Sequence, residues 1–173
     1  IITLCAVVTL LLTAFRSKPG VGNLGGAISL IGTGLALIFT CQLWDTDINI
    51  FNNLYTIDNF GTFFKVLFLI VSLLVTLISL RYVEREEKIA GEYYSLLLFG
   101  VLGMMVMVSS NNFITIFIGL ELMSIPIYVL CGLMSGNPRS AEASLKYFLL
   151  GAFATAFLLY GMAIIYGTTG ILD

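Results

Sequence analysis

FITIFIGLELMSIPIYVLCGLM, residues 113–134, is an apolar run that contains one charged residue, Glu121. About 20 consecutive apolar residues are enough for a helix to cross the hydrocarbon core of a bilayer. An ionised side chain at the centre of that core costs roughly 2.5–3.5 kcal/mol, even on the lenient insertion scale. Glu121 is therefore a candidate functional residue, and we expect it to take part in a proton or ion path.

The composition of the whole chain indicates an integral membrane protein. Hydrophobic residues make up 59% of the 173 residues, charged residues make up 10%, and the mean hydropathy is +1.04. The net charge of −2 gives no indication of nucleic-acid binding. The chain has no histidine, which disfavours haem ligation by imidazole and most zinc chemistry.

Six apolar segments bounded by polar or turn residues predict six transmembrane helices. Their approximate boundaries are 1–15, 24–44, 61–83, 93–109, 112–134 and 142–167. None of these segments alternates as the strands of an outer-membrane barrel do, and a helix satisfies its own backbone hydrogen bonds in lipid. We therefore expect an all-α, integral membrane helical bundle, with residues 1–173 forming a single transmembrane domain.

The basic residues near the short loops predict the orientation of this bundle. They are Arg16, Lys18, Arg81, Arg85, Lys88 and Arg139. The loops at 45–60 and 110–111 carry no basic residue. By the positive-inside rule, the three basic loops face the cytoplasm or matrix, and the acidic loop with Asp45, Asp47 and Asp58 faces outward.

Small residues predict where helices approach each other closely. The second segment carries Gly25, Ser29 and Thr33 at a four-residue spacing, and the sixth carries Gly151 and Thr155. Such spacing is typical of helix contacts in lipid, and it indicates close packing without naming the partner helix.

The fifth segment carries a polar stripe. Glu121, Ser124 and Tyr128 fall at i, i+3 and i+7, so they share one helix face. Pro126 lacks a backbone donor, which frees the carbonyl of Leu122 and tends to kink the helix. A kinked polar stripe is suited to holding water. The alternative is that Glu121 is a buried hydrogen-bonding acid that fixes helix packing.

Lys146 begins a second apolar run that continues to Tyr166. One interpretation makes it a partner of Glu121 in proton transfer, and the other pairs it with Glu142, four residues earlier, at the inner end of the sixth helix. Along the two helices, Glu121 and Lys146 differ in depth by roughly 10 Å, so a direct ion pair is not implied. Water would have to connect them, bridged by polar side chains of the two helices, Ser124, Tyr128 and Tyr147.

Lys65 is a further candidate for the polar path. It lies near the outer end of the third segment, where a lysine can extend its ammonium group to the membrane surface. We favour this surface position over a role in transfer.

Several strings in the second half of the chain resemble one family. They are Tyr93-Tyr94-Ser95-Leu96-Leu97-Leu98-Phe99, Leu102-Gly103-Met104-Met105, Gly119-Leu120-Glu121-Leu122-Met123-Ser124, Ser144-Leu145-Lys146-Tyr147-Phe148-Leu149-Leu150-Gly151-Ala152, Leu159-Tyr160-Gly161 and Tyr166-Gly167. Together they resemble the antiporter-like membrane subunits of respiratory complex I, the NADH:ubiquinone oxidoreductase, and most closely the amino-terminal part of its subunit 2. The resemblance covers roughly residues 55–170.

The resemblance implies a proton-translocating subunit of the electron transport chain without a redox centre of its own. The flavin, the iron-sulfur clusters and the quinone site are then expected in other subunits. Glu121 matches a family glutamate that pairs with a lysine on a later, broken helix, and Lys146 matches a lysine on the sixth helix. The later lysines and the inverted second half of the family fold have no positions in this sequence. We therefore expect a second chain or a missing segment to complete the fold, beside other membrane-arm subunits and lipids.

Two alternatives remain: a subunit of a multisubunit cation/proton antiporter, and a structural membrane-arm component that no longer pumps. The resemblance places the chain in an energy-coupling membrane. The short chain favours a divided subunit of the mitochondrial inner membrane, and the bacterial plasma membrane is the alternative.

Overall fold

The computed structural model describes residues 1–15, 21–51, 54–85, 90–134 and 136–172. The side chains at 21–23, 84–85 and 90–91 are also outside the described part, as are the predicted basic loop residues Arg16, Lys18 and Lys88. The described elements are α1 (Ile2–Phe15), α2 (Val21–Cys41), β1 (Ile48–Ile50), β2 (Tyr55–Ile57), α3 (Asn59–Arg85), α4 (Ala90–Val108), α5 (Phe113–Cys131) and α6 (Pro138–Thr169).

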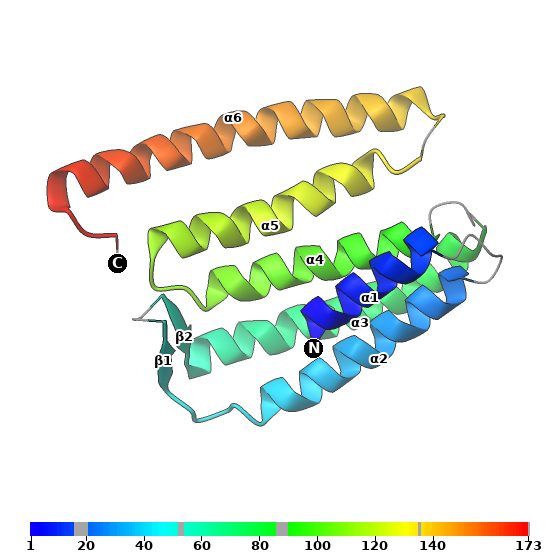
Figure 1. Ribbon diagram of the computed structural model, residues 1–173, viewed down its shortest axis with the longest axis horizontal. Coiled ribbons are helices and arrows are strands. Elements are labelled where there is room, and N and C mark those ends of the chain that lie inside the picture. The colour runs from blue at the N-terminus through cyan, green and yellow to red at the C-terminus, as the bar shows by residue number, and fades with distance from the viewer. Residues whose placement is uncertain (16–20, 52–53, 86–89, 135, 173) are drawn as a thin grey trace.

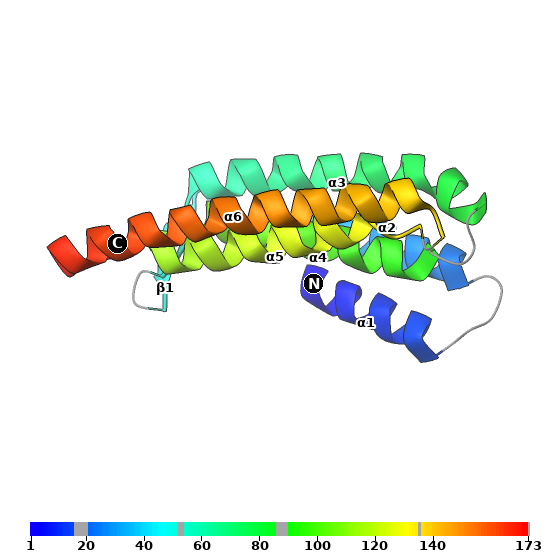
Figure 2. The same ribbon diagram turned by 90° about the horizontal axis from the view of Figure 1, so that it is seen from above.

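The helices run up and down through one elongated bundle, and α6 lies at its edge against α5 (Figure 1). The ends of α1, α3 and α5 lie at the same end of the bundle as the starts of α2, α4 and α6 (Figure 1). Seen from above, α1 lies on one side of the layer that contains α4 and α5, and α3 lies on the other (Figure 2). This alternation is the arrangement that the predicted topology requires.

The predicted helices are confirmed, with boundaries that differ by a few residues. Four described helical segments are long and apolar enough to cross a bilayer: Leu24–Cys41, Asn59–Val83, Phe113–Cys131 and Pro138–Thr169. The described apolar parts of α1 and α4 are shorter, Ile2–Phe15 and Glu92–Val108. The sixth helix starts at Pro138, four residues before the predicted boundary, because the Asn137 side chain caps it and Pro138 fits the first turn.

The interior between α1, α2, α3 and α4 combines apolar and hydroxyl side chains. Its apolar core includes Ile2, Ala6, Leu69, Leu98 and Val101. Buried hydroxyl side chains share this interior, and several of them, such as Thr33, Thr40 and Thr76, donate a hydrogen bond to a backbone carbonyl of their own helix. They include Thr9, Ser29, Thr33, Thr40, Thr62, Ser72, Thr76, Ser79 and Ser95.

The small residues of α2 form a buried face, as predicted. Ser29 and Thr33 are both fully buried, and the Thr33 hydroxyl donates to the Ser29 carbonyl over 2.7 Å. Gly32, on the same part of the helix, lies directly against the Cys5 side chain of α1. Gly32 therefore allows α1 and α2 to approach closely.

Helices α4 and α5 meet backbone to backbone. A Cβ atom added at Gly103 of α4 would lie 2.7 Å from the Gly119 carbonyl oxygen and 2.7 Å from the Leu122 carbonyl carbon of α5. A Cβ atom added at Gly119 would lie 2.8 Å from the Met107 backbone nitrogen. The absence of side chains at both positions places α5, with Glu121, directly on α4.

The segment 45–60, expected to be a loop, contains a short antiparallel hairpin. Strands β1 and β2 pair with Ile48 opposite Ile57. The Thr56 amide donates to the Ser109 carbonyl over 2.7 Å, which fixes the hairpin to the end of α4. The prediction missed it because two strands of three residues are too short to give a clear alternating pattern.

Candidate proton-transfer site

Glu121 lies near the middle of α5, which begins at a capped residue. The Asn112 side chain accepts a hydrogen bond from the Ile114 amide over 2.9 Å, and the helix then continues to Cys131. Glu121 is half-buried, and its Oε1 atom is fully buried without a hydrogen-bond partner among the described residues. A buried carboxyl oxygen that lacks a partner favours a bound water or a proton over a purely structural role.

The predicted polar stripe follows Glu121 toward the inner end of α5. Ser124 and Tyr128 are both about 8% exposed, and the helix runs without a break through the buried Pro126. Glu121, Ser124 and Tyr128 thus mark one face of the helix, as their spacing predicts.

Tyr128 connects this face to α6. Its ring packs edge to face on Tyr147, with ring centroids 4.9 Å apart, and on Phe148, with centroids 5.8 Å apart. Its hydroxyl group lies over Gly151, where any Cβ atom would collide with it. The Tyr128 carbonyl also accepts a hydrogen bond from the Ser144 hydroxyl over 2.8 Å. Tyr147 therefore contacts Tyr128, the last residue of the polar stripe, and Gly151 leaves space for the Tyr128 hydroxyl group.

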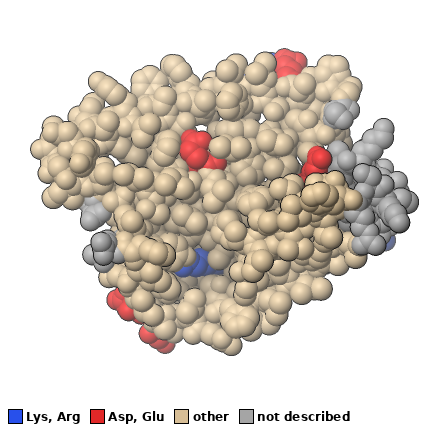
Figure 3. All heavy atoms as spheres, viewed as in Figure 1, with Lys and Arg blue, Asp and Glu red and all other residues tan. Residues whose placement is uncertain are grey.

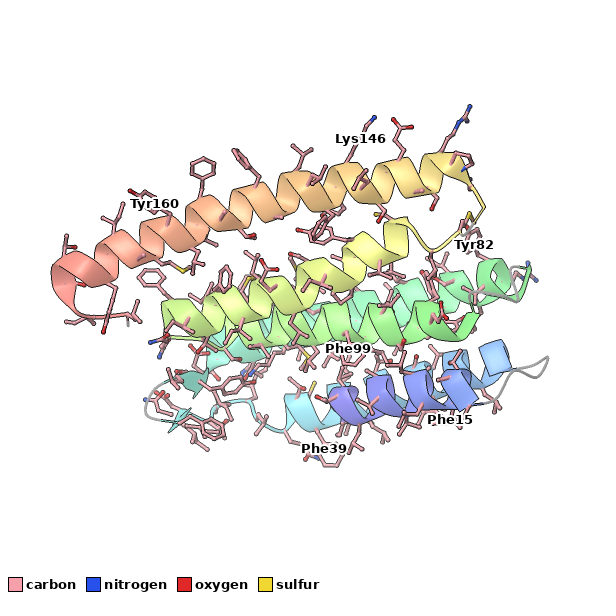
Figure 4. The ribbon with its side chains drawn as sticks, turned by 45° about the horizontal axis from the view of Figure 1, so that its top comes forward. Phe15, Phe39, Tyr82, Phe99, Lys146 and Tyr160 are labelled. Atoms are coloured by element: carbon pink, nitrogen blue, oxygen red, sulfur yellow. The ribbon has the colours of Figure 1, made fainter. Side chains whose placement is uncertain are left out.

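Lys146 lies on a different face of α6. Figure 4 shows its side chain pointing away from α5, on the outside of the bundle. It forms a salt bridge with Glu142, and the two side chains are 70% and 62% exposed. Of the two interpretations of Lys146, the described structure therefore shows the pair with Glu142, and it does not place Lys146 beside Glu121. The reason is helical phase, since Ser144, Phe148 and Gly151 face α5 and Lys146 does not.

Lys65 is placed differently from the expected surface position. It is only 4% exposed, and its ammonium nitrogen lies 5.0 Å from the centroid of the Tyr55 ring. The ammonium group does extend toward the outer end of α3, as a lysine near a membrane surface would. However, the side chain does not reach open water, because the hairpin that carries Tyr55 covers it.

Charged groups are sparse on the face of the molecule drawn in Figure 3, and most of that surface is formed by other residues. This distribution is typical of a protein whose surroundings are lipid or other membrane helices. A charged side chain within one of these helices, such as Glu121, Lys146 or Lys65, is therefore a candidate for the proton-transfer site.

Comparison with known proteins agrees with this arrangement. Residues 110–173 match the family described as NADH:quinone oxidoreductase/Mrp antiporter, TM. The chain is 44% identical over 172 residues to NADH-quinone oxidoreductase subunit N of Trichlorobacter lovleyi, a match that covers 98% of this chain and 35% of the relative. It is 39% identical over 170 residues to subunit N of Desulforamulus reducens, with 98% and 35% covered.

Over nearly its whole length, the chain is similar to NADH-quinone oxidoreductase subunit N. This confirms the expected likeness to a membrane subunit of complex I, and these relatives are named subunit N and not subunit 2. The chain spans about a third of the length of the curated subunit N relatives that it matches.

Two solved respiratory complexes contain a chain of the same fold. In respiratory complex I from Thermus thermophilus with bound aureothin, the match has a TM-score of 0.80 and 32% identity, and covers 99% of this chain and 36% of the other. In the membrane-bound sulfane sulfur reductase, an archaeal respiratory membrane complex, it has a TM-score of 0.83 and 25% identity, with 99% and 37% covered. The bundle described here therefore recurs in respiratory membrane complexes.

Proposed function

We propose that this chain is part of a subunit N-type, proton-translocating component of an NADH-quinone oxidoreductase. The structural observation that carries the proposal is the half-buried Glu121, with one buried and unpartnered carboxyl oxygen, in a helix long enough to span a bilayer. The likeness to subunit N over nearly the whole chain supports the same assignment. Ubiquinone or another quinone is then reduced elsewhere in the complex, and this chain moves protons without a flavin, an iron-sulfur cluster or another cofactor of its own.

The coupling rests on the electrostatics of Glu121. A positive charge that moves to roughly 8 Å from an ionised carboxylate changes its energy by about 2 kcal/mol at an effective dielectric constant of about 20. Moving one charge across about 100 mV requires about 2.3 kcal/mol. The two energies are comparable, so the approach of a positive charge to Glu121 involves an energy on the scale needed to move one charge across the membrane.

The test is Glu121→Gln in the complete subunit, assembled in its native membrane complex. This change keeps the shape of the side chain and removes its ability to carry a proton, so we expect NADH-driven proton uptake into inverted vesicles to fall sharply while the amount of assembled complex is unchanged. Glu92→Gln is the matched control, because Glu92 is exposed in the first turn of α4. Unchanged proton uptake in Glu121→Gln would remove this residue from the mechanism.

A second candidate function is that of an antiporter-like module in a different respiratory or cation-exchanging complex. The match to the sulfane sulfur reductase, whose TM-score of 0.83 is slightly higher than the 0.80 of complex I, favours this candidate. The description of the matching family also includes Mrp antiporters. Purification of the native complex distinguishes the candidates, since flavin and NADH oxidation would accompany complex I and neither would accompany a cation exchanger.

We also propose that other protein covers the outer face of α6. The Glu142–Lys146 pair is mostly exposed there, amid exposed apolar side chains such as Leu149, Leu150 and Phe153. Charged groups in direct contact with lipid at membrane depth are costly, so a polar protein surface is the more stable neighbour. The covering protein is either a further segment of the same fold or a neighbouring membrane-arm subunit.

A double variant, Glu142→Gln with Lys146→Met, tests this cover in the complete membrane complex. We expect less assembled complex, because polar groups of the covering protein would no longer contact the charges of Glu142 and Lys146. If lipid alone covered this face, removing both charges would leave assembly unchanged or improve it.

Under this proposal, the chain crosses an energy-coupling membrane several times. The bacterial relatives support the plasma membrane of a bacterium, while the mitochondrial inner membrane remains the prediction made from the sequence. Fractionation of the source cells, with the complex followed by its NADH oxidation, distinguishes the two.

A further inference from the structure

We propose that Lys65 is a proton-exchanging residue at the outer end of the bundle, connected to the outer aqueous phase by water held between α3 and α4. The inference rests on the proposed proton-translocating function, and it adds a second site on a different helix from Glu121. It is carried by the burial of Lys65 and by unpartnered hydroxyl groups at the start of α3 and the end of α4.

The first observation is a buried cation without an acid. Lys65 lies six residues into α3, about 9 Å along the helix from its start at Asn59. Its ammonium group faces the Tyr55 ring, and no carboxylate of a described residue lies within salt-bridge distance. A cation–π contact stabilises an ammonium group by less than the burial of that ion costs in lost hydration. The ammonium group therefore needs further polar partners.

The second observation supplies those partners. Thr62 lies one turn before Lys65 on the same face of α3, and its hydroxyl oxygen is fully buried without a hydrogen-bond partner. The Ser109 hydroxyl of the α4 end is also buried and unpartnered, 3.6 Å from where a Cβ atom of Gly61 would lie. Buried hydroxyl groups are normally hydrogen-bonded, so the two unpartnered hydroxyls of Thr62 and Ser109, both beside the first turn of α3, indicate bound water at this end of the helix.

The third observation connects this cluster to the surface. Asp58 is half-exposed just before α3, and its Oδ1 atom accepts a hydrogen bond from the Gly61 amide over 2.7 Å. The same atom lies 2.8 Å from where a Cβ atom of Gly61 would be, so the Asp58 carboxylate and the Ser109 hydroxyl flank Gly61. Asp58 and Lys65 are about 10 Å apart along the helix, a span that a short chain of water molecules can bridge.

Two other acids of the described residues lie at this end of the bundle, Asp45 and Asp47 before the hairpin, and the Asp45 carboxylate accepts a hydrogen bond from the Asn59 side chain over 3.3 Å. Helices α1 and α2 carry no Asp, Glu, Lys or Arg, and the outer half of α4 carries none either. The groups facing Lys65 that can titrate are thus Tyr55 from β2 and, through water, Asp58. In the proposed step a bond between the ammonium nitrogen and a proton breaks, a bound water takes the proton, and lysine is left as a neutral amine. Water passes the proton outward past Asp58, and the reverse step reloads the amine.

The decisive variant is Lys65→Arg in the complete subunit of the native complex. Arginine keeps the positive charge and stacks on a tyrosine ring, but it does not release a proton in a protein. We expect both Lys65→Arg and Lys65→Met to move fewer protons per NADH oxidised in inverted vesicles. A Lys65→Arg complex that pumps as well as the wild type would overturn the proposal, because it would show that charge alone is required.

Thr62→Val tests the water without changing the lysine. It removes one buried hydroxyl, and we expect a smaller loss of proton uptake than in Lys65→Arg. Thr76→Val is the matched control, because Thr76 is equally buried on α3 but its hydroxyl already donates to the Ser72 carbonyl over 2.7 Å. Equal effects of Thr62→Val and Thr76→Val would argue against a water path and would sink the proposal.

Density for water gives a readout that does not depend on pumping or on whether variants assemble. In a map of the native complex that resolves ordered water, we expect molecules bonded to Thr62, Ser109 and the Lys65 ammonium. A dry cluster would overturn the inference. If Glu121→Gln pumps normally while Lys65→Arg does not, the role of Glu121 fails and that of Lys65 stands; the opposite result leaves Glu121 in place and removes Lys65.

Discussion

The two sides of α5 are built differently. On the side of α4, glycines bring the two backbones into direct contact, at Gly103 and Gly119. On the side of α6, the contact depends on side chains, with Tyr128 set against Tyr147 and Gly151 and a hydrogen bond from Ser144. The first contact leaves little room for adjustment, whereas the second can change when a side chain rotates. Glu121 therefore lies between a fixed neighbour and an adjustable one.

The largest effect is expected when the fixed contact is broken by Gly103→Leu. The added side chain would meet backbone atoms of α5 that cannot move aside, so we expect a loss of stability of about 3 kcal/mol or more, seen as a lower temperature of inactivation and less assembled complex. Gly161→Leu in α6 is the control, because no atom lies within 4 Å of a Cβ atom there. Similar stability of the two variants would contradict the backbone contact.

A smaller effect is expected at the adjustable contact, from Gly151→Ala. The new methyl group would collide with the Tyr128 hydroxyl, the end of a side chain that can rotate, so we expect a loss of about 1 kcal/mol. Tyr128→Phe removes the nearest colliding atom and should recover part of the stability when combined with Gly151→Ala. A double-mutant cycle of thermal inactivation measures this coupling. Additive effects of the two changes would mean that Tyr128 and Gly151 do not touch.

The helices were predictable because each is an apolar run of the length that a bilayer requires. The boundary of α6 was less accurate, because the capping by Asn137 and the fit of Pro138 carry little hydropathy signal. The hairpin at 48–57 was missed for a related reason, since its strands are short and lie in a polar segment.

The candidate site was predicted in part. The common face of Glu121, Ser124 and Tyr128 follows from helical spacing alone. The spacing of Glu142 and Lys146 also allowed their ion pair, but its exposed position depends on which face of α6 meets α5. The burial of Lys65 was not predictable, because it results from the hairpin that folds over the start of α3. Thr62, one turn before Lys65 on the same face, was the available signal for a polar cluster there.

The direct seating of α5 on α4 also has a mechanical consequence. Two backbones in contact through glycine cannot slide past each other without a clash, so α4 and α5 should move as one rigid unit. A movement that brings a charge toward Glu121 must then come from the side of α6. There, rotation of the Tyr128 ring can loosen or restore the contact between α5 and α6. In this arrangement α4 and α5 keep their relative position, and α6 is the helix that moves.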